Sequence, residues 1–562
     1  EKMSAKKIVL NSMLLAAFIL SACGGAFSAP AEPAEESPAS PSRIEEYEES
    51  PAAEEPVAEE PATADYSSGE SYSGQSAEGS APSYSGSNQP QSTPSAPFRE
   101  QKSDGEPTDM FFENYGTNPI IDTDDDHLST FALDVDTGSY TIMRNYLNDG
   151  NLPPKNSVRV EEYINYFEQG YEQPSARQAF AIHLDGAPSP FTQTERYEML
   201  RVGIQGYDVS NRERKDVSLT FVIDVSGSMD MDNRLGLVKR SLEMLVEQLG
   251  RRDSVSIIVY GSNARVVLDP TPASAKGEIL SAIYNLRSEG STNAEAGIKL
   301  GYKTAMRAYN PDGINRVILC SDGVANVGKV EANAILDEVH GYVEEGITMA
   351  TFGFGMDNYN DTLMEQLADN GDGFYAYIDD TNEARRLFVD DLTSTLQTIA
   401  MDAKVQVDFN PEVVSRYRLV GYENRDVADE DFRDNSVDAG EIGAGHSVTA
   451  LYEIKLYREA YGRVATVHMR WEDPDTHQVV EIEKDIYAGD FEKEFRDADP
   501  YFQRAVVVAE YAEILGDSYW AEDSDLGDVY DEARWLEDYF DREDEMEEFV
   551  DLVKQARKEI RW

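Results

Sequence analysis

The amino-acid sequence predicts an α/β domain with a doubly wound, mostly parallel sheet, inserted between β-rich flanking segments. Three observations support this fold class. Between residues 215 and 400, strand and helix patterns alternate strictly, which is typical of a parallel sheet covered by helices on both faces. On both sides of this region, apolar residues recur with a period of two, which indicates antiparallel strands. Residues 24–105 are mainly Ala, Pro, Glu, Ser, Gly and Tyr, and they carry too little apolar surface to form a core.

The amino terminus has the pattern of an export signal. Lysines precede an apolar run over residues 8–20, which is too short to span a membrane as a helix. The run ends in Leu-Ser-Ala-Cys, which resembles the lipobox of bacterial lipoproteins. The resemblance implies removal of residues 1–22 and attachment of lipid to Cys23. The protein would then be anchored at the cell envelope, on the outer membrane or the cell surface. The alternative is a soluble secreted protein in which the cysteine stands at this position by chance.

The charge of the chain limits the classes of partner. Its 562 residues include 107 Asp and Glu against 49 Lys and Arg, for a formal net charge of −58. This charge repels the phosphates of nucleic acids and of anionic lipids. We therefore expect no nucleic-acid partner, and contact with a membrane only through the lipid anchor.

The chain divides into six predicted parts. In order, they are an export signal (residues 1–22), a lipidated, disordered tether (23–105), an N-terminal α+β domain (106–214), the inserted α/β domain (215–400), a β-rich domain (401–495) and a helical region (496–562). Strands of the same character flank the insert. We therefore expect the strands near residues 180–206 to pack with those after residue 402 in one β-sandwich.

In the flanking segments, short stretches with regular apolar spacing predict the strands and helices. Before the insert, STFALDV predicts a strand, SYTIMRNYLNDG and VRVEEYINYF predict helices, and the stretches around FAIHLD and YEMLRVGIQG predict strands. After the insert, the predicted strands are KVQVDFN, SVTALYEIKLY, RVATVHMRWED and QVVEIEKDI. An apolar stripe from Ala505 to Leu515 then predicts the first helix of the carboxyl-terminal region.

The α/β domain shows one pattern for each element. Apolar runs predict six strands: SLTFVIDVS, SVSIIVYGS, ARVVLD, RVILCSDG, ITMATFGFG and GFYAYID. Helical spacing of apolar residues predicts LGLVKRSLEMLVEQLG, SAKGEILSAIYNL, AEAGIKLGYKTAMRAY, residues 331–345, NDTLMEQLADNG and one closing helix, TNEARRLFVDDLTSTLQTIA. Cys320, the only cysteine besides Cys23, lies in the strand RVILCSDG, so we expect a buried core residue without a disulfide.

Oxygen-bearing side chains lie at the ends of two of these strands and in the loop before the predicted helix AEAGIKLGYKTAMRAY. The candidates are Asp224, Ser226, Ser228, Thr292 and Asp322. In an open doubly wound sheet, ligands bind at the carboxyl ends of the strands, so we expect these residues to converge there. Two carboxylates and three hydroxyls without His or Cys favour a hard cation, Mg²⁺ first, with Mn²⁺ or Ca²⁺ as alternatives. Five residues do not fill the coordination shell, and an incoming carboxylate suits the open position.

The pattern D-x-S-x-S after a strand, a later Gly-Ser-Thr and a strand-ending Ser-Asp-Gly together resemble the von Willebrand factor type A domain. The resemblance implies a metal-ion-dependent adhesion site. In such a site Ser226, Ser228 and Thr292 contact the metal directly, Asp224 and Asp322 act mainly through water, and a partner protein supplies the last carboxylate. The flanking stretches FFENYGTNPI, STFALDVDTGSY and RVEEYINYF further resemble a bacterial family of lipoproteins that carry this domain between characteristic flanking domains.

One stretch in the N-terminal part offers a catalytic alternative. In FALDVDTGSY, Asp134 and Asp136 have the spacing of the nucleophile and acid–base pair of a phosphatase. Gly138 stands where that motif has Thr or Val, and no second half of the motif follows. We therefore expect the two aspartates to cap the helix that follows them.

These observations predict a protein that is not an enzyme. Three functions are given in order of preference, and the enzymatic one comes last. The first is a cell-envelope lipoprotein that binds an acidic side chain of a protein partner through Mg²⁺. The second is an envelope scaffold or assembly factor in which the metal is structural or intramolecular. The third is a phosphatase-like hydrolase that uses Asp134 and Asp136.

Overall fold

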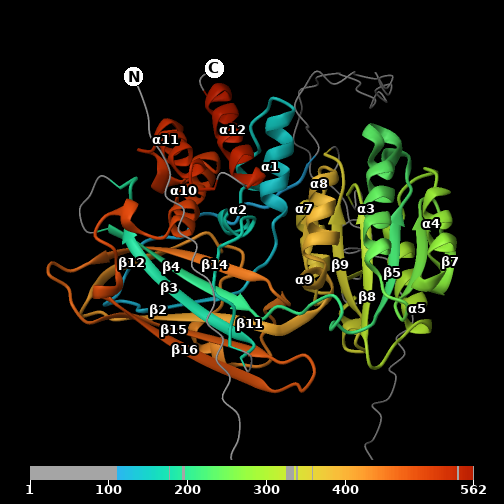
Figure 1. The fold of residues 1–562 in the computed structure, drawn as a ribbon, viewed down its shortest axis with the longest axis horizontal. Coiled ribbons are helices and arrows are strands. Elements are labelled where there is room, and N and C mark those ends of the chain that lie inside the picture. The colour runs from blue at the N-terminus through green and yellow to red at the C-terminus, as the bar shows by residue number, and fades with distance from the viewer. Residues whose placement is uncertain are drawn as a thin grey trace, which may run out of the picture. The chain divides into compact units, whose positions relative to one another are not determined.

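Two structural parts share the folded region: an α/β domain, and a β-sandwich built from the chain segments on both sides of it (Figure 1). The computed structural model describes residues 110–175, 178–192, 197–323, 335–336, 339–356, 359–540 and 543–560. The export signal, Cys23, the tether and part of the predicted helix at 331–345 lie outside the described residues. In the described part of the chain, none of the helices has the length and apolar character needed to cross a membrane.

The α/β domain contains a six-stranded sheet with the order β10-β9-β8-β5-β6-β7. The strands are β5 (Val217–Asp224), β6 (Ser254–Tyr260), β7 (Ala264–Pro272), β8 (Ile314–Ser321), β9 (Thr348–Gly353) and β10 (Tyr375–Tyr377). All neighbouring strands are parallel except β7, which pairs antiparallel with β6. The sheet order and the mostly parallel pairing confirm the predicted doubly wound domain.

Helices cover both faces of this sheet. The helices are α3 (Arg234–Gln248), α4 (Lys276–Tyr284), α5 (Ala294–Arg307), α7 (Asp361–Asp369), α8 (Thr381–Arg385) and α9 (Leu392–Leu396). Helices α3, α4, α8 and α9 share a core with Phe221 and Ile257, whereas α5 and α7 pack with Val222 and Ile258. Alternate residues of one strand thus enter opposite cores, as expected for a sheet buried on both sides. Cys320 is fully buried in the first core as a free cysteine, as predicted.

The predicted single closing helix is wrong. The helix α8 is followed by one π-helical turn, Arg386–Asp390, and then by the short helix α9, which ends at Leu396. Thr398 already opens the next strand, in which Thr398 pairs with Gly443 and Ala400 with Ile442. Apolar spacing continues through these residues, but pairing with a distant strand overrides the local helical pattern.

The flanking segments form the predicted β-sandwich. Its first sheet has the order β1-β12-β14-β4-β3, and its second the order β13-β11-β15-β16, with β2 also pairing with β11. The first sheet contains β1 (Ile121–Asp122), β3 (Phe180–Pro188), β4 (Tyr197–Gly206), β12 (Val414–Val420) and β14 (Ser447–Leu456). The second contains β2 (Leu128–Ala132), β11 (Thr398–Phe409), β13 (Gly440–Gly443), β15 (Arg463–Glu472) and β16 (Val479–Tyr487). Because β4 precedes the α/β domain and pairs with β14 beyond it, the domain is an insertion.

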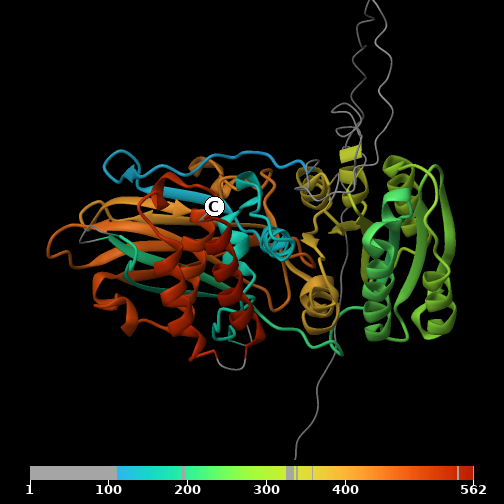
Figure 2. The same cartoon turned by 90° about the horizontal axis from the view of Figure 1, so that it is seen from above.

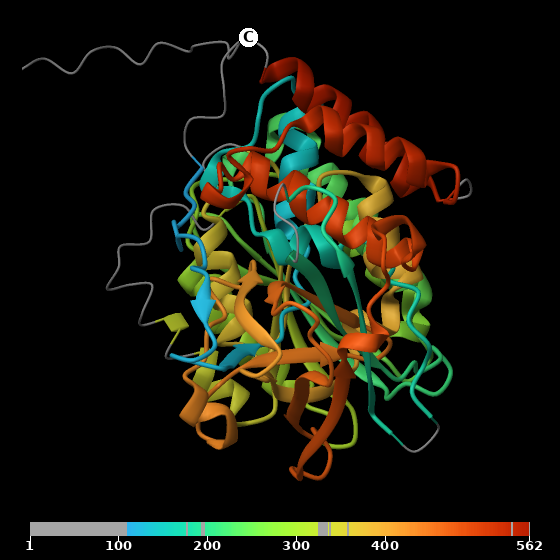
Figure 3. The same ribbon diagram turned by 90° about the vertical axis from the view of Figure 1, so that its left-hand side faces the viewer.

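A cluster of helices covers the outer face of the first sheet. It consists of α1 (Gly138–Asn148), α2 (Val160–Asn165), α10 (Pro500–Leu515), α11 (Leu526–Glu537) and α12 (Asp544–Glu559). They share a core with Met199 of β4 and Leu451 of β14. Figure 3 shows the carboxyl-terminal helices lying across the strands.

Helix α1 belongs to both parts of the structure. Its residues Tyr140 and Met143 enter the core of the helix cluster, whereas Ile142 and Tyr146 enter the core of the α/β domain beside α5 and α7. Figure 2 shows α1 between the carboxyl-terminal helices and the α/β domain. Thr141 also donates a hydrogen bond to the carbonyl oxygen of Tyr377 in β10, at 2.8 Å. The helix therefore covers the edge strand of the α/β sheet, which would otherwise expose unpaired backbone.

This contact makes a prediction for Gly138, the first residue of α1. A Cβ atom at Gly138 would lie 2.5 Å from Cε1 of Tyr375, and the hydroxyl of Tyr375 is fixed by hydrogen bonds with Asp361 and Tyr359. We expect Gly138→Ala to lower the free energy of unfolding by about 1–3 kcal/mol, because the buried ring has no free space to move into. Denaturant unfolding measures this value. Gly277→Ala in α4 is the control, since nothing lies within 4 Å of its added Cβ, and equal stability of the two variants would contradict the prediction.

Candidate metal centre

Two neighbouring strands place the predicted carboxylates at one edge of the α/β sheet. Strand β5 ends at Asp224, and β8 ends at Ser321, directly before Asp322. The two strands are parallel neighbours, with Ile223 paired to Cys320. Asp224 and Asp322 therefore emerge side by side at the carboxyl end of the sheet, where the sequence predicted them.

The turn after β5 brings both serines to this edge. The Oδ1 atom of Asp224 accepts a hydrogen bond from the backbone nitrogen of Ser226 at 2.7 Å, which closes the turn. The hydroxyl oxygens of Ser226 and Ser228 lie 3.0 Å apart, and Ser228 forms a side-chain hydrogen bond with Asp322. Four of the five predicted residues are thus linked in one group, in which the backbone of Ser226 makes the contact with Asp224.

Thr292 reaches the same edge on a separate loop. The backbone nitrogen of Glu289 donates to the carbonyl of Val225 at 2.5 Å, and that of Gly227 donates to Gly290 at 3.1 Å. Gly290 has a φ of +77°, a left-handed conformation that suits glycine. Among the hydrogen bonds of the described residues, none joins the side chain of Thr292 to the other four. The structure therefore places the loop of Thr292 beside the site without a direct side-chain link.

Burial sets the electrostatics of this group. Asp224 is 0% and Asp322 4% exposed. Burial raises the pKa of Asp224 to about 6, although a hydrogen bond from Ser226 works in the opposite direction. Burial also raises the pKa of Asp322, against hydrogen bonds with Ser228 and Arg234. A dication would offset the cost of two buried negative charges, and an all-oxygen donor set fits Mg²⁺, so the residues present suit the predicted metal. Their role as metal ligands stays a prediction.

One residue of this site, Arg234, was not predicted from the sequence. It opens helix α3, and its Nη1 atom donates to Oδ2 of Asp322 at 2.9 Å. Both side chains are buried, at 3% and 5% exposure. The available signal was a single basic residue in the acidic stretch that follows the D-x-S-x-S pattern, and it was too weak to suggest a contact with an aspartate 88 positions further on.

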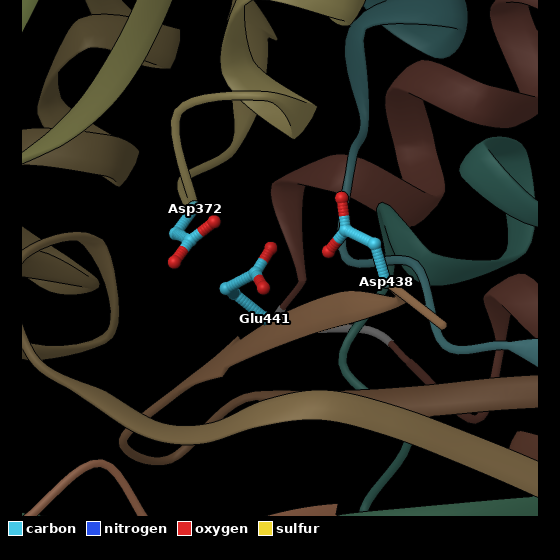
Figure 4. A group of neighbouring side chains, drawn as sticks. All are labelled: Asp372, Asp438 and Glu441. Atoms are coloured by element: carbon cyan, nitrogen blue, oxygen red, sulfur yellow. The ribbon is translucent and has the colours of Figure 1, made fainter. Parts of the chain in front are cut away.

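A second group of carboxylates lies elsewhere, at Asp372, Asp438 and Glu441 (Figure 4). One oxygen from each side chain lies within 4.8 Å of the others. Burial and the neighbouring Asp438 raise the pKa of Asp372 to about 7, and both Glu441 and Asp372 interact with the buried cation Arg316. With one converging oxygen from each, the three side chains provide fewer ligands than Ca²⁺ normally takes, and Arg316 already supplies positive charge. We assign no metal to this group.

The predicted helix-capping role of Asp134 and Asp136 is wrong. Thr137 is the residue before α1, and its side chain makes no capping hydrogen bond. Instead, Oδ1 of Asp136 accepts from the backbone nitrogen of Tyr375 at 2.9 Å, and Oδ1 of Asp134 accepts from the nitrogen of Asp136 at 2.8 Å. A second, ionic partner also holds these aspartates.

That partner is Arg425, which follows β12. Its guanidinium forms ion pairs with Asp134 at 3.1 Å and Asp136 at 3.4 Å. On the opposite side it pairs with Glu365 of α7 at 3.2 Å and with Asp369 at 3.1 Å. We call these five residues the Arg425 junction. One cation thus holds carboxylates of the flanking segment and of the α/β domain together, which gives the DVDTGSY stretch a structural role.

Comparisons with known families follow the same division of the chain. The von Willebrand factor type A domain matches residues 218–392. A family described as "von Willebrand factor" matches residues 106–199. The family described as "Uncharacterized protein YfbK, C-terminal" matches residues 394–462 and 458–558.

Two relatives illustrate the range of similar proteins. "Uncharacterized protein YfbK" of Escherichia coli (strain K12) is 40% identical over 352 residues, which cover 61% of this chain and 61% of that protein. The match therefore spans less than two thirds of the relative's length. Human "Inter-alpha-trypsin inhibitor heavy chain H3" is 26% identical over 215 residues, or 37% of this chain and 22% of that one. Among solved structures, "von Willebrand factor type A from Catenulispora acidiphila" is 16% identical with a TM-score of 0.41, covering 66% of this chain and 89% of its own.

The Arg425 junction yields a stability prediction. Replacement of Arg425 by Met would leave four acidic side chains, three of them nearly inaccessible to water, without the cation that they share. We expect Arg425→Met to lower the free energy of unfolding by about 3–5 kcal/mol. The control is Arg416→Met, because Arg416 pairs with Asp122 at the surface and should contribute about 0–1 kcal/mol. Similar urea midpoints for the two variants would disprove the expected role of Arg425.

The same junction predicts a pH dependence of stability. Burial raises the folded-state pKa of Glu365 from 4.5 to about 8, so between these values the folded chain holds a proton that the unfolded chain releases. Stability from this group is complete below pH 4.5 and is lost as pH rises toward 8. We expect the thermal midpoint to fall across this window, and Glu365→Gln to reduce the slope. An unchanged slope in the variant would show that Glu365 does not titrate there.

Proposed function

The chain contains a von Willebrand factor type A domain at residues 218–392, and we propose that this domain binds a protein partner through a divalent metal ion. Domains of this kind generally mediate protein–protein interaction. The proposed metal is Mg²⁺, held by Ser226, Ser228 and Thr292, with Asp224 and Asp322 acting mainly through water. The partner supplies a carboxylate from an acidic side chain.

The observation that carries this proposal is the grouping of oxygens at the ends of β5 and β8. Both carboxylates are buried, the turn after Asp224 brings two hydroxyls within 3.0 Å of each other, and backbone bonds fix the loop of Thr292 beside them. Buried acidic groups this close repel each other unless a cation or a proton separates them. Protein side chains fill only part of an octahedral shell, and the remaining position is open to a partner's oxygen.

A scaffold function is the second candidate, and a separate observation favours it. The α/β domain is joined to its flanks by buried ion pairs in addition to the Arg425 junction. Arg144 of α1 forms two hydrogen bonds to the carboxylate of Asp379, at 2.6 and 2.7 Å, and both side chains are buried. A domain held this firmly suits an assembly factor in which the metal supports the structure.

We also propose that Cys23 carries a lipid anchor and that residues 24–105 form the tether between the anchor and the folded region. The support is the Leu-Ser-Ala-Cys sequence after a short apolar run. The protein would then display its metal site away from the membrane surface at the cell envelope. We propose no catalytic role for Asp134 and Asp136, because they are 5% and 3% exposed and paired with Arg425.

The test is crosslinked capture of the partner from intact cells, with and without a chelator. We expect capture to fall at least about tenfold with chelator and in Asp322→Ala, because both remove the metal that links the two proteins. Asp438→Ala is the matched control, since it removes an acid from the other carboxylate group and should leave capture unchanged. Full capture by Asp322→Ala in the presence of chelator would refute metal-dependent binding.

Thermal unfolding separates the scaffold from the binding module. If the metal is structural, chelation lowers the unfolding midpoint strongly and leaves partner capture unchanged. If the metal links two proteins, capture is lost while the midpoint falls only by the free energy of metal binding.

A further inference from the structure

Arg234 places a permanent positive charge within the candidate metal centre. Its guanidinium bonds to Asp322 at 2.9 Å, and its side chain is only 3% exposed. An arginine does not lose its proton in a protein, so the charge persists at every pH at which the protein folds. Burial keeps water from screening this charge, so its effect on nearby ions is strong.

The position of the guanidinium is fixed from two sides. Arg234 opens α3, so its backbone follows the turn that carries Ser226 and Ser228. On the other side lies Gly355, in the loop after β9, with a φ of +83°. A Cβ at Gly355 would lie 2.2 Å from Nε of Arg234, so the loop backbone packs closely against the guanidinium. The arginine therefore has little freedom to swing away when a metal binds.

A fixed cation beside Asp322 weakens the binding of a metal ion and strengthens the binding of an anionic ligand. It repels a dication, so metal alone binds less tightly than it would without the arginine. It attracts an anion, so a carboxylate that completes the metal shell binds more tightly than a neutral oxygen ligand. Both effects act in addition to the ion pair that Arg234 forms with Asp322.

We propose that Arg234 is a specificity-determining residue that makes the metal site prefer a carboxylate over a neutral oxygen ligand such as a carboxamide or water. This inference rests on the proposed function of the site. Under this inference, the anionic ligand is selected by a residue of the chain as well as by the charge of the metal. A purely structural role, in which Arg234 only neutralises Asp322 and supports the Gly355 loop, predicts no such preference.

The experiment measures the dissociation constant of Mg²⁺ from the full chain by calorimetry, in sodium acetate, in acetamide with sodium chloride, and in sodium chloride alone. Ionic strength and free Mg²⁺ are matched among the three solutions. Because binding linkage is reciprocal, a bound acetate that favours the metal must tighten Mg²⁺ binding by the same factor. For the wild-type chain we expect tighter Mg²⁺ binding in acetate and no change in acetamide.

The variants Arg234→Gln and Arg234→Lys isolate the charge. In sodium chloride alone, we expect Arg234→Gln to bind Mg²⁺ about tenfold more tightly, because one repulsive charge is removed. In acetate, we expect this variant to lose the tightening seen in the wild type. Arg234→Lys keeps the charge and should keep the preference for acetate.

The possible failures are distinct. If the wild-type chain does not bind Mg²⁺, or if Asp322→Ala binds it equally well, the proposed function itself is refuted. If Mg²⁺ binds but acetate and acetamide act alike in the wild type, the inference about Arg234 is overturned, and this outcome needs no variant to fold. If Arg234→Gln retains the acetate preference, the metal alone selects the carboxylate and the inference is again overturned.

Discussion

The ion pairs of Arg425 are the constraint on which the relation between the two parts of the structure depends. A single guanidinium contacts two carboxylates of the flanking segment, Asp134 and Asp136, and two of helix α7, Glu365 and Asp369. Burial and the neighbouring Asp134 raise the pKa of Asp136 well above its usual range, so part of the cluster holds protons. Such a cluster is costly to break because each separated part would keep unpaired buried charge. The junction therefore opposes separation of the insert from its flanks.

Beside this junction, helix α1 covers strand β10, and Asp136 of the junction accepts a hydrogen bond from Tyr375 of that strand. The short strand stands at the edge of the α/β sheet, where free backbone groups invite pairing with another chain. Thr141 satisfies a carbonyl of that strand, and Gly138 allows the helix to approach the ring of Tyr375. The flanks thus protect one edge of the sheet, while the candidate metal centre occupies the carboxyl ends of the central strands β5 and β8. The contacts with the flanks and the candidate metal centre thus lie on different strands of one sheet.

The fold and most of the candidate site could be predicted because their signals are local. Alternating patterns specified the sheet, and the D-x-S-x-S turn placed Asp224, Ser226 and Ser228 within five positions of one another. The closing helix was mispredicted because Thr398 pairs with Gly443, a contact that local periodicity does not report. Arg234 and the role of Asp134 were missed for the same reason: their partners, Asp322 and Arg425, are distant in sequence. Ionic contacts between residues distant in sequence produce no periodic pattern of residues from which they could be predicted.

The metal and Arg234 also bear on how so acidic a chain could bind an acidic partner. A net charge of −58 repels such a partner at long range, although salt shortens this repulsion to about 8–10 Å under physiological conditions. Inside that distance, the field at the site depends on the charges buried there, among them two carboxylates, a dication when bound, and the guanidinium of Arg234. Attraction is then confined to one small region of an otherwise repulsive surface. Under the proposed function, selectivity follows from this contrast, because only a carboxylate aligned with the site gains more than it loses.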